Sequence, residues 1–340
     1  MLAYSKKLFE AGQAGGLDTK RLSAFAEKAV LTNAGDIVVF FLVCDISDDA
    51  VWSHSQKPTY ILSSDGGHTW SEPAELGNKR GRVYDARNYN GAILALHFAK
   101  GNDINFLGNK EEHVYELYVS DDGGRTFGKR SDLPFDTNGK SYGTMGMLDS
   151  GQIVVYIYNS NDERASDYVV SDDGGRTFGK RSDLPFDTNG KSYGTMGMLD
   201  SGQLVVYIYN RNDEQASDYA VSDDGGYSWS APKTAHLAKK IRNPQLVSLN
   251  GCYFMHGRSG SLGEEKGHMV LYSSRNGLDW DAGVYLRKRT AGLRAYSNSI
   301  VVGALKPNSP QQVLIQASHA YEQHKTNVLH WWLDMTRQGR

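Results

Sequence analysis

Short apolar runs alternate with polar turns that contain glycine along almost the whole chain. The runs 36–44, 92–98 and 114–120 span seven to nine residues each, and Gly, Asn and Asp cluster between them. Apolar runs of this length, bounded by turn-forming residues, are typical of β-strands. No segment shows the apolar spacing of an amphipathic helix. The pattern therefore predicts an all-β protein made of many short strands.

One eight-residue phrase, Ser-x-Asp-x-Gly-x-Thr-Trp in its fullest form, recurs along the chain. Good copies begin at Ser63, Ser120, Ser171 and Ser222, and a less regular copy, SSRNGLDW, begins at Ser273. Successive copies start 57, 51, 51 and 51 residues apart, so one supersecondary unit is repeated. Asp and Ser side chains hydrogen-bond the backbone of tight turns, and Gly tolerates positive φ. Each copy therefore predicts a turn between two strands.

The strand-like runs fall into groups of four between successive copies of the phrase. Six groups begin near residues 24, 83, 141, 192, 242 and 296. The last group lacks one strand, and the N-terminal run 3–9 can supply it. We therefore expect a six-bladed β-propeller with four-stranded blades, closed by pairing of the N-terminal strand with the last blade. Residues 1–340 are expected to form this single propeller domain.

Two neighbouring units are almost identical. Residues 120–170 and 171–221 differ at only four of 51 positions. Blades contact mainly their neighbours, so insertion of a whole blade is tolerated if the ring still closes. The near-identity indicates either a very recent duplication or an engineered protein, and the residues leave both open.

Charge and motifs exclude several classes of protein. The chain has 37 Lys and Arg against 39 Asp and Glu, a formal net charge of −2, which offers no long-range attraction to nucleic acid or to an anionic membrane. No run of 18 apolar residues predicts a transmembrane helix. No P-loop, dinucleotide-binding or zinc motif occurs, so we expect no cofactor and no metal site.

Neither localisation nor oligomeric state follows from the residues. The segment MLAYSKKLFEAGQAGG lacks the apolar core of a signal peptide, and a secreted or cell-surface origin stays open. Nothing in the sequence marks a subunit interface.

The innermost strands of a propeller begin around a central channel, so their first residues are expected to line a funnel. The charged, polar and aromatic candidates at these positions are Arg82, Asp85, Arg87, Tyr142, Tyr193, Arg242, Asn243, Arg294 and Tyr296. A guanidinium group binds a carboxylate through two hydrogen bonds, and aromatic faces stack on sugars. The expected partner is therefore a glycan or another small polar or anionic ligand.

The phrase resembles the Asp-box, or BNR repeat, of sialidase-type propellers, and three further segments resemble the same family. The resemblance implies that the boxes lie on the rim, remote from the active site. It implies a general acid/base at Asp48 or Asp49, a carboxylate-binding arginine at Arg258, and a tyrosine nucleophile at Tyr296, within RAYSNSIVV. The unperturbed pKa of a phenol is about 10, so such a nucleophile needs a nearby carboxylate to accept its proton.

The sequence departs from the family pattern at two positions that bear on catalysis. Phe25-Ala26-Glu27 stands where the family has an arginine, and Asn243 stands where it has the glutamate that activates the tyrosine. Three functions therefore stay open. They are a sialidase-like exo-glycoside hydrolase with an incomplete arginine triad, a non-catalytic glycan-binding propeller, and an engineered, blade-duplicated scaffold without activity.

Overall fold

A computed structural model gives the architecture of the chain. It describes residues 2–9, 22–45, 54–55, 58–99, 114–135, 140–159, 166–187, 190–260, 267–287, 297–302, 311–322 and 325–334.

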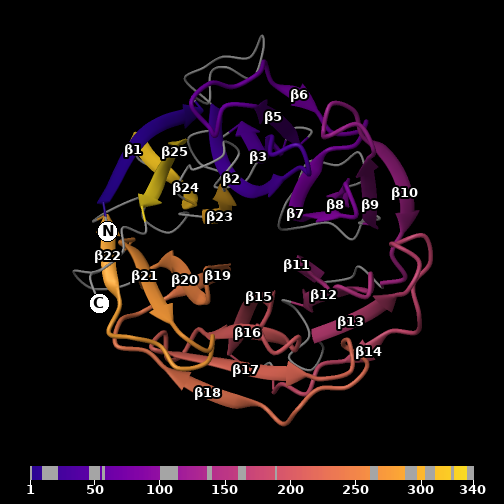
Figure 1. Ribbon diagram of the computed structural model, residues 1–340, viewed down its shortest axis with the longest axis vertical. Coiled ribbons are helices and arrows are strands. Elements are labelled where there is room, and N and C mark those ends of the chain that lie inside the picture. Colours follow the sequence, from indigo (N-terminus) through magenta and orange to yellow (C-terminus); the bar gives the residue numbers. More distant parts are fainter. Residues whose placement is uncertain are drawn as a thin grey trace.

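Six antiparallel β-sheets are arranged around a central axis (Figure 1). Blade I contains β2 (Leu22–Leu31), β3 (Ile37–Asp45), β5 (Thr59–Ser63) and β6 (Ala74–Glu75), with the short β4 (His54–Ser55) beside β3. Blade II contains β7 (Gly81–Tyr89), β8 (Ala92–Ala99), β9 (Val114–Ser120) and β10 (Gly128–Asp132). Blade III contains β11 (Lys140–Met147), β12 (Ile153–Asn159), β13 (Ser166–Ser171) and β14 (Ser182–Asp183).

The other three blades repeat this order. Blade IV contains β15 (Lys191–Met198), β16 (Leu204–Asn210), β17 (Ala216–Ser222) and β18 (Lys233–His236). Blade V contains β19 (Arg242–Leu249), β20 (Cys252–Arg258), β21 (Met269–Ser274) and β22 (Val284–Arg287). Blade VI contains β23 (Ser297–Val302), β24 (Gln312–Glu322), β25 (Lys325–Asp334) and β1 (Leu2–Phe9). The first strand of each blade lies nearest the axis (Figure 1).

The N-terminal strand closes the ring. β1 pairs antiparallel with β25, in a register that runs from Leu2 opposite Asp334 to Phe9 opposite Val328. It therefore forms the outermost strand of a blade whose other three strands come from the C-terminal end of the chain. The predicted six-bladed, four-stranded propeller and its mode of closure are confirmed.

Apolar layers between neighbouring blades form the core. Val38 and Phe40 of β3 pack with Val83 of blade II, whereas Ile37 and Val39 on the opposite face pack against blade VI. Successive side chains of a strand point to opposite faces of its sheet. Each blade lies between two others, so both faces are buried and the strands consist of nearly continuous apolar runs.

The repeated phrase forms the turn between the third and fourth strands of each of blades I to V. In blade III, Ser171 Oγ donates to Asp173 Oδ1 over 2.9 Å. The same carboxylate accepts hydrogen bonds from the Thr177 backbone N–H at 2.9 Å and from Thr177 Oγ1 at 2.6 Å. The hydrogen bonds from Thr177 hold the pKa of Asp173 well below its usual range. Asp173 therefore stays ionised and fixes the turn.

The first and third strands of a blade run in the same direction, so both end at the same end of the ring. We call this end the far end, and the opposite end, where the innermost strands begin, the mouth. The phrase turns and the turns between first and second strands therefore lie at the far end. These turns are therefore remote from the mouth.

Candidate functional site

The innermost strands are irregular near the mouth. A shift of pairing register marks a β-bulge, which inserts an extra residue and changes the direction of the side chains around it. Such shifts occur in β2 between Ala26 and Lys28, in β7 between Val83 and Asp85, in β11 between Lys140 and Tyr142, in β15 between Ser192 and Gly194, and in β19 between Arg242 and Gln245. The bulges therefore change the direction of side chains in the channel-lining strands of blades I to V.

Tyrosine side chains gather at the mouth on blades III and IV. The Tyr193 ring lies 4.9 Å from that of Tyr142, edge to face, and 5.9 Å from that of Tyr158. It is nearly parallel to Tyr209, with an interplanar angle of 7° and a centroid distance of 6.2 Å. Tyr193 also adopts a φ of +41°, an unusual conformation for a bulky residue that often marks functional sites. Tyr193 is half-buried.

Arg242 lies beside this cluster, at the start of β19. Its guanidinium carbon is 5.5 Å from the centre of the Tyr209 ring, and its Nη2 donates to Tyr209 Oη at 3.1 Å. Its Nε is 3.3 Å from Glu214 Oε1. The contacts with the Tyr209 ring and hydroxyl, together with the ion pair to Glu214, fix the orientation of the planar guanidinium. A half-buried arginine beside tyrosine rings is suited to binding an anionic or hydroxylated ligand.

Two further residues of blade V lie close to Arg242. Arg258 is the cross-strand partner of Arg242 and is only 6% exposed. Asn243 follows Arg242 in the chain, has a φ of +53° and is buried. Within the described part of the chain, neither polar atom of its side-chain amide has a hydrogen-bond partner. Leaving a buried amide unpaired costs on the order of 1–3 kcal/mol, so Asn243 is placed at an energetic cost that packing alone does not explain.

A buried ion pair joins blades I and II below the mouth. Arg82 Nη2 lies 2.5 Å from Glu27 Oε1, and Arg82 Nε donates to Glu27 Oε2 at 3.2 Å. Burial raises the pKa of Glu27 to about 7, against the lowering effect of the Arg82 charge. Arg82, predicted to bind ligand, thus makes a bidentate contact with a residue of the protein itself.

Lys28 extends across the centre of the channel. Its Nζ donates to Gln245 Oε1 of blade V at 2.6 Å and lies 3.4 Å from Asp85 Oδ1 of blade II. Burial lowers the pKa of Lys28, and the Asp85 charge opposes this effect. Gln245 Nε2 in turn donates to Tyr142 Oη at 3.2 Å. These contacts connect blades I, II, III and V through the middle of the ring.

Asp85 is the acceptor on which this network converges. It is fully buried and accepts hydrogen bonds from Thr144 Oγ1 at 2.8 Å and from the Met145 N–H at 2.7 Å. Although burial opposes ionisation, the charges of Arg87 and Lys28 hold the pKa of Asp85 below its usual value. We call Glu27, Lys28, Arg82, Asp85 and Gln245 the central network.

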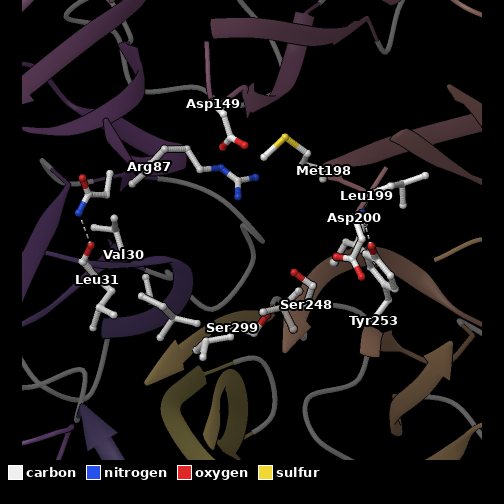
Figure 2. Close-up of a pocket in the computed structure, with 18 of the residues that line it drawn as sticks. Val30, Leu31, Arg87, Asp149, Met198, Leu199, Asp200, Ser248, Tyr253 and Ser299 are labelled. Atoms are coloured by element: carbon white, nitrogen blue, oxygen red, sulfur yellow. Dashed lines mark hydrogen bonds between the residues drawn. The ribbon is translucent and has the colours of Figure 1, made fainter. Parts of the chain in front are cut away.

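The predicted site residues fall into three groups. Arg242, Asn243 and Arg258 lie together at the mouth. Arg82 and Asp85 belong to the central network, and Arg87 points into a cavity at the far end (Figure 2). The remaining predictions, Asp48, Asp49, Arg294 and Tyr296, lie outside the described residues.

Sequence reasoning missed Glu27, Lys28 and Gln245 as channel residues. One signal was present, because Glu27 and Lys28 are the only charged residues in the otherwise apolar run AFAEKAVL. A charged side chain within a buried strand requires a partner of opposite charge. The partners come from other blades, and the sequence does not identify them.

Two further features concern only the described part of the chain. There, no three His, Cys, Asp or Glu side chains gather closely enough to hold a metal ion. Within the same ranges, no helix is long and apolar enough to cross a membrane.

The architecture matches solved structures at low sequence identity. A protein of unknown function from Dyadobacter fermentans superposes with a TM-score of 0.71 and 16% identity, over 98% of this chain and 99% of that one. The Hadza microbial sialidase Hz136 gives 0.70 and 13%, over 97% and 68%. An α-L-arabinanase of Penicillium chrysogenum, complexed with arabinobiose, gives 0.68 and 11%, over 98% and 99%. The chain is thus similar in fold to sialidase-like propellers. No protein-family model matches its sequence, and no curated protein matches it.

Proposed function

We propose that the protein acts on glycans at the mouth of the ring, as a sialidase-like exo-glycoside hydrolase. The observation that carries the proposal is the placement of Arg242 against Tyr209 and beside Tyr193. A fixed guanidinium binds a sugar carboxylate or hydroxyl groups, and a half-buried tyrosine face stacks on the sugar ring. The fold shared with a sialidase and with an arabinanase that holds arabinobiose supports a glycan as the ligand.

The catalytic step follows the chemistry of retaining glycosidases. In this scheme the Tyr296 phenol first gives its proton to a carboxylate base, and its oxygen then attacks the anomeric carbon while Asp48 or Asp49 protonates the departing glycosidic oxygen. Water, deprotonated by the same aspartate, then displaces Tyr296 and releases the sugar. Arg258 and Arg294 hold the carboxylate of the ligand in this scheme. Tyr296 itself lies outside the described residues, and the residue after it, Ser297, begins β23.

A second candidate, glycan binding without turnover, is favoured by Asn243. An amide cannot accept the phenolic proton of Tyr296, and the Asn243 amide stands where the sialidase family has the glutamate that activates the tyrosine. Its burial without a hydrogen-bond partner is compatible with a group inherited from a site that has lost its base. Under this candidate the mouth binds the same ligands and releases them unchanged.

The phrase and the near-identical units complete the proposal. We infer that the phrase is an Asp-box and that residues 171–221 arose by duplication of a blade, in nature or by design. If the mouth neither binds nor cleaves glycans, the remaining interpretation is an engineered scaffold without activity.

Hydrolysis of a panel of aryl glycosides, sialosides included, tests the proposal. Tyr296→Phe is expected to lower turnover by orders of magnitude while leaving binding of the intact sugar within a few fold, because only the nucleophilic oxygen is removed. Arg242→Gln is expected to weaken both binding and turnover. Tyr227→Phe, at an exposed tyrosine of a far-end turn, is the matched control and should change neither.

The outcomes separate the candidates. Turnover that depends on Tyr296 supports the hydrolase. Binding that depends on Arg242, with no turnover of any glycoside, selects the binding module. A folded protein that neither binds nor cleaves any member of the panel overturns both.

A further inference from the structure

Two half-exposed ion pairs lie at the mouth on blades IV and V. In the first, Arg242 Nε is 3.3 Å from Glu214 Oε1. In the second, Lys191 at the start of β15 pairs through Nζ with the Asp218 carboxylate. The two cationic side chains are 17% and 16% exposed, and both carboxylate side chains are 11% exposed. Each pair therefore places a positive and a negative group side by side where solvent reaches both.

The turn between β16 and β17 positions Glu214 against blade V. The Glu214 carbonyl oxygen accepts a hydrogen bond from the Ile241 N–H at 2.8 Å, which ties this mouth-end turn to the residue that precedes Arg242. The Arg242 guanidinium is oriented from its other side, because Nε and Nη2 contact Tyr209 Oη at 3.3 and 3.1 Å. The protein therefore fixes both members of the pair before any ligand arrives.

The pair keeps hydrogen-bonding capacity that a ligand can reach. Arg242 Nη1 has no partner among the described residues, and it is not buried. Apart from its contact with Arg242, the Glu214 carboxylate has no partner in the same ranges, and neither of its oxygens is buried. A ligand at the mouth thus meets an open donor and an open acceptor next to each other.

This arrangement distinguishes a carboxylate from a hydroxyl group. A sugar carboxylate bound to Arg242 would lie beside the Glu214 carboxylate, and like charges side by side at a half-buried site disfavour the complex. A hydroxyl group both accepts and donates a hydrogen bond. The hydroxyl groups of an uncharged sugar can therefore accept from Arg242 Nη1 and donate to Glu214 without breaking the ion pair.

The cations deeper in the channel do not supply a substitute. Arg82 pairs with Glu27, and Lys28 Nζ lies 3.4 Å from Asp85 Oδ1. Arg258 is only 6% exposed. The first two cations carry their own carboxylates, and the third offers little surface to a ligand.

We propose that Arg242 and Glu214 select uncharged sugars, so that the glycans recognised at the mouth are neutral and not carboxylated ones such as sialosides. The inference rests on the proposed glycan site, and it puts hydroxyl groups in place of the ligand carboxylate in the catalytic scheme. Glu214 determines the specificity, because it accepts a hydrogen bond from a hydroxyl group and repels a carboxylate.

Isothermal titration of the full chain with matched pairs of glycosides tests the charge preference. The pairs are methyl glucoside with methyl glucuronide, methyl galactoside with methyl galacturonide, and the methyl ester of methyl sialoside with the sialoside itself. The members of a pair share the sugar ring and differ in the charge of one group. In the pair that binds most tightly, the uncharged member is expected to bind about tenfold more tightly or better. Equal affinities, or tighter binding of the charged member, would overturn the inference.

Glu214→Gln tests the residue to which the preference is assigned. The amide keeps an acceptor oxygen and loses the charge, so binding of the uncharged sugar should weaken by no more than about threefold. The charged member should gain affinity, which narrows the difference within the pair to about threefold or less. Glu72→Gln, at an exposed glutamate beyond the first phrase turn, is the matched control and should change neither affinity. An unchanged difference in Glu214→Gln contradicts the assignment to Glu214.

Arg242→Gln separates failure of this inference from failure of the glycan site. A carboxylated sugar that binds best and loses affinity in Arg242→Gln would leave the mouth as the glycan site and remove only the preference for uncharged sugars. If the folded protein binds none of these glycosides, or binds them equally well in Arg242→Gln, both the glycan site and the charge preference are wrong.

Discussion

At the scale of single residues, the interior of the ring holds titratable groups whose ionisation depends on burial. His256 of β20 is fully buried, and its Nδ1 lies 3.1 Å from Ser297 Oγ of blade VI. Burial, reinforced by the nearby charge of Lys28, lowers the pKa of His256 to about 3. The imidazole therefore stays neutral at any pH at which the protein would normally function.

This depressed pKa predicts acid sensitivity. The unfolded chain protonates His256 near pH 6.5, whereas the folded protein does so only near pH 3. Stability is therefore fully present above pH 6.5 and is lost as the pH falls toward 3. At pH 5 the linkage amounts to about 2 kcal/mol. Urea unfolding at pH 7 and pH 5 should show a smaller acid-induced loss in His256→Asn than in the parent protein, by about that amount.

The control for this prediction is His236→Asn, at an exposed histidine of β18. It should show the same loss between pH 7 and pH 5 as the parent. If His256→Asn loses as much stability on acidification as the parent does, His256 is not the group that titrates.

The sequence predicted which strands line the channel but not which side chains meet in it. Arg82 and Asp85 were expected to face a ligand, and the sequence did not predict that the structure pairs them with Glu27 and Lys28. Two features cause the difference. The alternation of apolar and polar residues along a strand reveals neither of them. A bulge in β2 changes the direction of the side chains around Glu27, and the partners come from a different blade.

At the scale of the element, the phrase turn also makes the contact between blades. The fifth residue of each good copy is a glycine with positive φ, and in blade IV it is Gly226, with a φ of +92°. A Cβ at this position would lie 2.5 Å from Val154 Cγ2 of blade III. The glycine is therefore required both by the backbone conformation and by the close approach of the preceding blade.

A pair of glycine substitutions in blade IV separates these two requirements. Gly202 has a φ of +82° with no atom within 4 Å of an added Cβ, so Gly202→Ala should cost only the conformational strain, about 1 kcal/mol. Gly226→Ala should cost about 1–3 kcal/mol more, because Val154 must also move. Denaturant unfolding measures both. Equal losses for the two variants would show that the phrase glycine is needed for the turn alone.

The less regular phrase shows how far such a motif predicts its element. The turn was expected, but in blade V the Ser–Asn contact is made by Ser274 and Asn276, one residue later than in the other copies. The identical segments SYGTMGM of β11 and β15 likewise differ, because the register shift falls before Tyr142 in one and at Tyr193 in the other. Tyr142 packs on Tyr84 and Tyr193, whereas Tyr193 packs on Tyr142, Tyr158 and Tyr209. Because the two segments are identical in sequence, the neighbouring blades determine where the register shift falls.

At the scale of the whole molecule, repetition made the architecture predictable. The spacing of the phrase set the number of blades, and the missing strand of the last group identified the run that closes the ring. Contacts across the channel, such as that of Lys28 with Gln245, join residues 217 positions apart and carry no sequence signal. The ring was therefore predictable from local patterns, whereas the chemistry at its centre required the structure.

The closing strand gives the last prediction. β1 pairs with β25 through seven residue pairs, and removal of Leu2–Phe9 would leave β25 as an unprotected edge. The shortened protein should unfold at a temperature lower by roughly 10 °C. Its free energy of unfolding falls by several kcal/mol, and each kcal/mol lowers the unfolding midpoint of a chain this large by a few degrees. It should also self-associate in sedimentation velocity. A synthetic peptide of residues 1–10 should restore both the midpoint and the monomer, and a scrambled peptide of the same composition should restore neither. An unchanged midpoint in the shortened protein would show that the ring is held closed by the apolar layers between blades VI and I, without the contribution of β1.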